Sequence, residues 1–95
     1  MTAQGLVVRL YRPGKLGPGE AVIEGFDDDS GTTRRYRVQL GEDDYNDAVR
    51  AHRNGLQVAA AGDLEVRGTH LWLCHLSSFS VIPGLEYEDE SSGAD

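Results

Sequence analysis

The sequence of 95 residues predicts a mainly β fold, a five- or six-stranded antiparallel barrel with one helix between strands 3 and 4. Segment 41–55, GEDDYNDAVRAHRNG, has the end residues and the apolar spacing of a helix. Alternating apolar and polar residues predict strands on both sides of this segment. Glycine-rich or acidic turns separate the strands, which favours short connections between antiparallel neighbours.

Three strands are expected before the helix, at 6–11, 21–26 and 35–40. The loop 13–19, PGKLGPG, ends the first strand, and the polar turn 27–31, DDDSG, joins the second and third strands as a hairpin. Apolar and polar residues alternate along the first and third strands, so each is expected to turn one face to the core and one to water.

The helix is expected to begin with Asp43 or Asp44 as its N-cap and to end at Gly55, which takes the left-handed conformation. Acidic residues near its start and arginines near its end suit the helix dipole. The inward stripe follows i, i+3, i+4, i+7 spacing and consists of Tyr45, Ala48, Val49 and His52. A helix this short is marginal alone, so it must pack on the sheet.

A long strand is expected at 56–66, in which Gly62 marks a bulge or bend that lets a small barrel turn a corner. Another strand follows at 70–76, and 79–82 is a candidate for a last short strand. The strand and helix phases together predict a core of eight residues: Val8, Ile23, Val38, Val49, Val58, Leu64, Leu71 and Leu73.

Residues 1–85 are expected to form a single domain, and residues 86–95, EYEDESSGAD, an acidic disordered tail. The net charge is −7 at pH 7, and the tail contains five acidic residues and no basic one. The rest of the chain is therefore close to neutral. Overall acidity argues against tight nonspecific binding to DNA, although a local basic face is compatible with it.

The sequence also predicts a compartment. No apolar stretch approaches the roughly 20 residues that a membrane helix needs, and the first residues, MTAQGLVVRLYR, lack the apolar core of a secretory signal. Cys74 is the only cysteine, so no internal disulfide can form. We therefore expect a cytoplasmic protein.

The element order β-β-β-α-β-β resembles that of the OB-fold barrel. The residues that carry the resemblance lie in the helix and in the strands after it: Tyr45, Ala48, Ala51, His52, Gly55, Val58, Gly62, Leu64, Gly68, Leu71, Leu73 and Phe79. The chain is also similar to small uncharacterised domains of high-GC bacteria of the actinobacterial type. OB-like barrels hold oligonucleotides, oligosaccharides and proteins, so the resemblance implies a binding domain and leaves the ligand open.

No catalytic or metal site is expected. His70 and Cys74 are four residues apart on one strand, about 13 Å, and His75 points to the face opposite Cys74. The acidic turn 27–31 lacks the ligand spacing of a calcium loop, and the loop 13–19 matches no phosphate-binding motif. We therefore predict a protein that is not an enzyme and has no catalytic residue, metal or cofactor.

The candidate ligand surface lies on the solvent face of the first and third strands. Arg35 and Arg37 project from the third strand and Arg9 and Tyr11 from the first, and Phe26 is a second aromatic stacking candidate. Cations beside aromatic rings are what a single strand of nucleic acid requires. Surface arginines also keep sheets soluble, so the pattern has a purely structural interpretation as well.

Two functions follow from the sequence. The preferred one is a non-catalytic binding module, a protein-interaction domain or accessory subunit of a bacterial assembly, whose partner is another protein or a second copy of the chain. The alternative is a weak binder of single-stranded nucleic acid that uses the Arg35 and Arg37 face. Sequence alone favours the first, because the chain is acidic and stacking residues are few.

Overall fold

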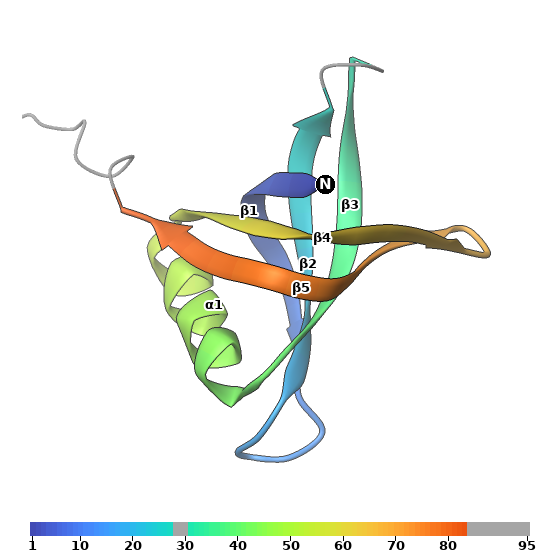
Figure 1. Cartoon of the computed structure of the whole chain (residues 1–95). Helices are drawn as coiled ribbons and strands as arrows, with labels where there is room; N and C mark the ends of the chain where they lie inside the picture. Colours follow the sequence, from blue (N-terminus) through green and yellow to red (C-terminus); the bar gives the residue numbers. More distant parts are fainter. Residues whose placement is uncertain (28–30, 84–95) are drawn as a thin grey trace, which may run out of the picture.

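A computed structural model of the chain describes residues 1–27 and 31–83, without the side chains of Phe26 and Asp27. The predictions made for residues 28–30 and for the tail 86–95 lie outside these residues. The elements in chain order are β1 Thr2–Tyr11, β2 Gly19–Asp27, β3 Thr32–Leu40, α1 Glu42–Asn54, β4 Gln57–Arg67 and β5 His70–Ile82. They form a closed five-stranded barrel with one helix between β3 and β4 (Figure 1), which confirms the OB-like fold class.

The strands follow the order β1-β2-β3-β5-β4, and β4 closes the barrel on β1. Four neighbouring pairs are antiparallel, whereas β3 and β5 pair in parallel at Tyr36–Val38 and Leu71–Leu73. The expectation of an antiparallel barrel therefore fails at this one seam. An odd number of strands cannot alternate in direction all the way around a closed ring, so a five-stranded barrel must contain one parallel pair.

The sixth strand considered at 79–82 is the end of β5, which runs without interruption from His70 to Ile82. The ladder between β4 and β5 shifts where Gly62 was expected to form a bulge or bend. Ala61 pairs with Ser78 and Asp63 with Cys74, so Gly62 lies opposite residues 75–77 of β5. A Cβ atom on Gly62 would overlap the carbonyl oxygen of Cys74, so this position has no room for a side chain. The ladder is therefore irregular at the predicted position, but the extra residues of the bulge belong to β5 and not to β4.

Helix α1 closes one end of the barrel (Figure 1). Gly41 is its N-cap and no side chain caps the first turn, so the predicted Asp43 or Asp44 cap is wrong. Both residues lie in the first turn and act only through the helix dipole. Gly55 takes the left-handed conformation and its N–H donates to the Ala51 carbonyl, as predicted.

The buried stripe of α1 consists of Tyr45, Ala48 and Ala51, whereas Val49 is half-buried and the predicted His52 is exposed. The two alanines let the helix backbone approach the barrel closely. Ala51 is one position before His52, so the true stripe is rotated slightly from the predicted one. Within the described residues no helix has both the length and the apolar composition to cross a membrane.

A bulge in β1 changes which residues face the core. The ladder with β2 pairs Val7 with Ile23 and then Arg9 with Val22, which leaves Val8 as an extra residue. Val7 is consequently buried and Val8 only half-buried, although Val8 was the predicted core residue. The His52 Nδ1–H donates to the Val7 carbonyl at 2.6 Å, so α1 supports the chain at the bulge.

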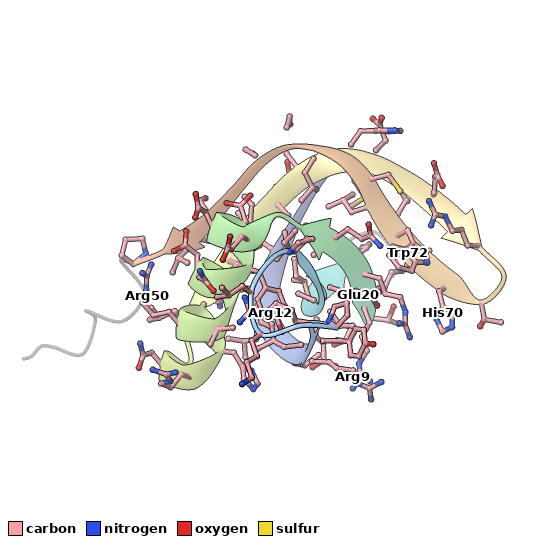
Figure 2. The ribbon with its side chains drawn as sticks, turned by 90° about the horizontal axis from the view of Figure 1, so that it is seen from below. Arg9, Arg12, Glu20, Arg50, His70 and Trp72 are labelled. Atoms are coloured by element: carbon pink, nitrogen blue, oxygen red, sulfur yellow. The ribbon has the colours of Figure 1, made fainter. Side chains whose placement is uncertain are left out.

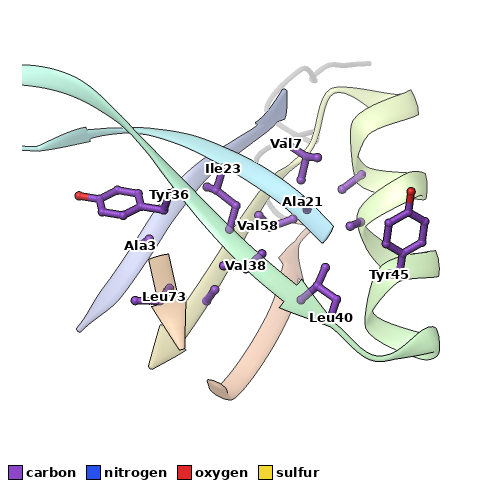
Figure 3. Packing of buried hydrophobic residues seen from close by; sticks show 13 residues of the cluster. Ala3, Val7, Ala21, Ile23, Tyr36, Val38, Leu40, Tyr45, Val58 and Leu73 are labelled. Atoms are coloured by element: carbon purple, nitrogen blue, oxygen red, sulfur yellow. The ribbon is translucent and has the colours of Figure 1, made fainter. Parts of the chain in front are cut away.

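The core fills the space between the strands and α1 (Figure 3). Ile23, Val38, Val58 and Leu73 are its largest fully buried side chains, and all four were predicted. Val49 and Leu71 are half-buried at its margin. Small residues that the sequence did not single out complete it, among them Ala3, Ala21 and Ala60.

Leu64 is the clear error in the predicted core, because 46% of it is exposed. It points to the same side of β4 as buried Val58 and Ala60, since residues two apart share a face. However, the β4–β5 hairpin extends past the other strands (Figure 1), so its inner face is not covered there. The side of β4 to which Leu64 points was predicted correctly. The prediction was wrong about how far along β4 this side is covered.

Strands β1 and β2 cross at Gly5 and Gly25 with no space for side chains. A Cβ atom on Gly5 would overlap the Glu24 carbonyl oxygen, and one on Gly25 would overlap the Gln4 carbonyl oxygen. We expect Gly5→Ala to lower the free energy of unfolding by about 1–3 kcal/mol, because two backbones must separate. Urea unfolding followed by circular dichroism measures this. Gly14→Ala, in the exposed loop after β1, is the control and should change stability little; equal effects would contradict the close crossing.

Candidate functional site

A row of side chains crosses the outside of the barrel in register. Arg9 on β1 pairs with Val22 on β2, Val22 with Arg37 on β3, and Arg37 with Trp72 on β5. Directly opposed residues project from the same side of a sheet. Val22 faces outward, because its neighbours Ala21 and Ile23 are fully buried, yet only 6% of it is exposed. The side chains around Val22 therefore cover it.

A groove of about 440 Å³ lies on this face. Strands β1, β2 and β3, the turn between β4 and β5, and the start of β5 supply its lining residues: Val8, Arg9, Val22, Arg34, Arg35, Arg37, Thr69, His70 and Leu71. Four of the nine are arginines, and none is acidic. In Figure 2, Arg9 and His70 lie on the side of the barrel away from α1, whereas Arg50 projects from α1 itself. The groove lining is thus rich in guanidinium groups on an acidic chain, with the carboxylates of Glu20 and Glu24 beside two of them.

Two of these arginines are held by carboxylates of β2. The Arg35 Nε–H donates to Glu24 Oε2 at 2.9 Å, and the Arg37 guanidinium donates to Glu20 Oε2 at 3.1 Å. The Arg35 pair is exposed and the Arg37 pair is partly buried. Ion pairs near the surface add little stability, so the main effect of both is to orient the two guanidinium groups. Each guanidinium carries five N–H donors, so most remain available to a ligand. Arg9 forms no ion pair within the described residues.

An aromatic ring continues the row beyond Arg37. Trp72 is half-buried, and the Arg67 guanidinium lies 4.9 Å from its ring centroid. Glu65 Oε1 accepts from the Arg67 Nε–H at 3.0 Å and so fixes that guanidinium over the ring. A second hollow of about 250 Å³ opens beside the ring, between Gln39, His75 and Leu76 among others. Trp72 therefore lines the smaller hollow, next to Arg37 of the cationic groove.

The structure brings Arg9, Arg35 and Arg37 into one groove, as their strand positions suggested. Tyr11 is exposed and lies apart, beside a hollow of about 170 Å³ formed with the loop before β2. The side chain of Phe26 lies outside the described residues, so that candidate stays a prediction.

The sequence interpretation missed Arg34, His70 and Trp72. A signal for Trp72 existed, because predicting Leu71 and Leu73 as core residues implies that the residue between them faces out. For Arg34 and His70 there was none: they join the groove only because the β4–β5 turn comes near β3 in space.

Contacts outside the arginine groove are made by Cys74, His52 and His75. An Arg67 N–H group lies 3.4 Å from Cys74 Sγ, and His75 Nδ1 lies 3.3 Å from Asp63 Oδ2. His52 contacts the Val7 carbonyl, as described above. Residues 1–27 and 31–83 contain no group of three or more histidine, cysteine, aspartate or glutamate side chains that could hold a metal ion.

Comparison with family models, with curated proteins and with solved structures found no match for this chain. The resemblance to small domains of high-GC bacteria consequently stays a prediction from sequence. Any functional proposal has to be built from the groove itself.

Proposed function

We propose that this domain is a non-catalytic binding module that holds single-stranded nucleic acid in the arginine groove. The observation that carries the proposal is the composition of the groove, four arginines and a histidine with no carboxylate in the lining. Phosphate groups are the anions that a row of guanidinium groups recognises best, because the planar fork of N–H donors matches two phosphate oxygens.

The position of the groove supports the same ligand. OB barrels take oligonucleotides on the β2–β3 face and at the loop between β4 and β5. Val22 of β2, three arginines of β3 and Thr69 of the β4–β5 turn line this groove. Trp72 adds a ring on which a base can stack, next to the cations that would contact the phosphates. The ligand is therefore expected to run across β3 toward β5.

Binding should be moderate and sensitive to salt. The chain carries a net charge of −7, and Glu20 and Glu24 compete with phosphates for Arg37 and Arg35. Long-range repulsion of a dense polyanion opposes the local attraction, which disfavours duplex DNA more than a flexible single strand.

The double variant Arg9→Ala/Arg37→Ala tests the proposal. It should weaken binding to a labelled oligo-dT of about 12 nucleotides, a length within the site size of one OB barrel. It should also flatten the plot of log K against log salt by about 1.4, because each lost phosphate contact on a single strand accounts for about 0.7. Fluorescence anisotropy across a salt series measures both.

The matched control is Arg50→Ala/Arg53→Ala on α1, which removes the same charge from an exposed surface outside the groove. It should leave the salt slope unchanged. A parent chain that does not bind the oligonucleotide, or an equal loss in both double variants, would contradict the proposal.

The protein contact that the sequence favoured remains a proposal for a different surface. Residues 63–67 of β4 lie beyond the ladder with β1 and could contact a partner, which would leave the arginine groove open.

A further inference from the structure

One edge of β4 lacks a partner strand near the tip of the β4–β5 hairpin. Strand β1 pairs with β4 from Gln57 to Ala61, and Met1 exchanges backbone hydrogen bonds with Gly62, while β4 continues to Arg67. Over residues 63–67, the free edge of β4, no strand of the described part of the chain pairs on the side away from β5. Figure 1 shows this part of the hairpin extending beyond the other strands.

The hairpin turn fixes which backbone groups point outward. Arg67 and His70 close a two-residue turn, and the closing pair of such a hairpin exchanges hydrogen bonds. Bonded and non-bonded pairs alternate along an antiparallel ladder. The N–H and C=O groups of Leu64 and Val66 therefore point away from β5, toward the free edge.

The side chains of the same two residues are open as well. Leu64 is 46% exposed and Val66 is 68% exposed. Strand edges that stay monomeric are often blunted by proline or by charged side chains of one sign; residues 63–67, DLEVR, contain no proline, and their charges are of both signs. Leu64 and Val66 thus expose both their outward backbone groups and their apolar side chains to a partner.

We propose that the free edge of β4 pairs with the same edge of a second copy, antiparallel, about a twofold axis through Glu65. Leu64 of each copy then lies opposite Val66 of the other. These are the residues whose backbone groups point outward, so each of the two pairs exchanges two main-chain hydrogen bonds. The interface is isologous, as a twofold dimer requires.

Charge complementarity selects this register and this occupant. The register places Asp63 of each copy opposite Arg67 of the other, in a non-hydrogen-bonded pair, where side chains come closest. The two Glu65 carboxylates face each other across the axis, but each already accepts from Arg67 of its own chain at 3.0 Å, which offsets their repulsion. The segment DLEVR is therefore complementary to itself when reversed.

Charge reversal on the full chain tests the pairing. Asp63→Arg alone and Arg67→Asp alone each place like charges opposite one another twice, so both variants should be monomeric at concentrations where the parent dimerises. Mixing the two variants restores both opposite-charge pairs and should yield a heterodimer. Sedimentation velocity of the parent, each variant and the mixture measures this, and circular dichroism checks that each variant is folded.

The matched control reverses an exposed pair on α1, Asp47 and Arg50, whose charged groups lie 3.5 Å apart. Asp47→Arg and Arg50→Asp should leave dimerisation at the parental level, alone or mixed. Val66→Pro provides a second variant, because it removes an outward N–H without touching the ladder to β5; it should also abolish the dimer. A parent that is monomeric up to millimolar concentration, or a variant mixture that stays monomeric, would overturn the proposal.

Discussion

Replacing Leu73 with alanine should lower the free energy of unfolding by about 2–5 kcal/mol. Leu73 is 1% exposed and lies at the parallel seam, opposite Val38 on β3 and Leu64 on β4. Truncation leaves a cavity where three strands meet, and neighbours on a closed barrel cannot move inward freely to fill it. A small domain has only about 5–15 kcal/mol of stability, so this loss is a large share.

Urea unfolding of the parent and the variant measures this effect, at concentrations low enough that the chain is monomeric. Leu64→Ala is the matched control, because it removes the same atoms from the residue directly opposite on β4. Since Leu64 is about half exposed, its truncation should cost much less than that of Leu73. Similar losses for both leucines would show that the inner face of the hairpin is covered in solution.

Local chemistry was enough to predict the order of the elements. The helix was predictable because Gly55 and the charges at its two ends are signals within a few residues of one another. The hairpins were predictable for the same reason, since turn residues separate runs of alternating polarity. These local signals do not show which strands distant in sequence pair with each other. The parallel pairing of β3 with β5 could therefore not be predicted from them.

Errors in the core have the same origin. Alternating polarity shows which residues of a strand face the core only while the strand is regular. In β1 the bulge at Val8 shifts the set of residues that face the core. The His52 contact that supports the bulge joins residues 45 positions apart in sequence. For Leu64 the phase was correct, but periodicity cannot say where the covering strands end.

Much of the candidate site was nonetheless predictable. Arg9, Arg35 and Arg37 were expected on solvent faces, and cross-strand register brings them together. Their partners Glu20 and Glu24 could not be assigned from the sequence, because the pairing depends on the register of the β2–β3 hairpin. The register also makes Trp72 a neighbour of Arg37, which gives the face an aromatic ring that the sequence interpretation did not count.

Trp72→Ala should weaken binding of single-stranded DNA about 5- to 150-fold, if the arginine groove is the binding surface. Stacking of one base on an aromatic side chain contributes about 1–3 kcal/mol, and each 1.4 kcal/mol corresponds to about tenfold in affinity. The ring is half-buried between Arg37 and the second hollow, and Arg67 lies over it. A base that stacks there must contact the ring directly and displace or share the Arg67 contact.

Trp72 is the only tryptophan of the chain, so fluorescence excited at a wavelength that tyrosine does not absorb reports on this ring alone. Titration of the parent with oligo-dT should quench the emission, because a stacked base is in direct contact with the indole. Trp72→Phe is the matched control, since it keeps an aromatic face, and anisotropy should show most of the affinity retained. An oligonucleotide of abasic sites should bind the parent and the alanine variant equally, because it offers phosphates and no base. Binding of oligo-dT that is unchanged by Trp72→Ala would show that the arginines hold the strand by its phosphates and that the bases face away from the barrel.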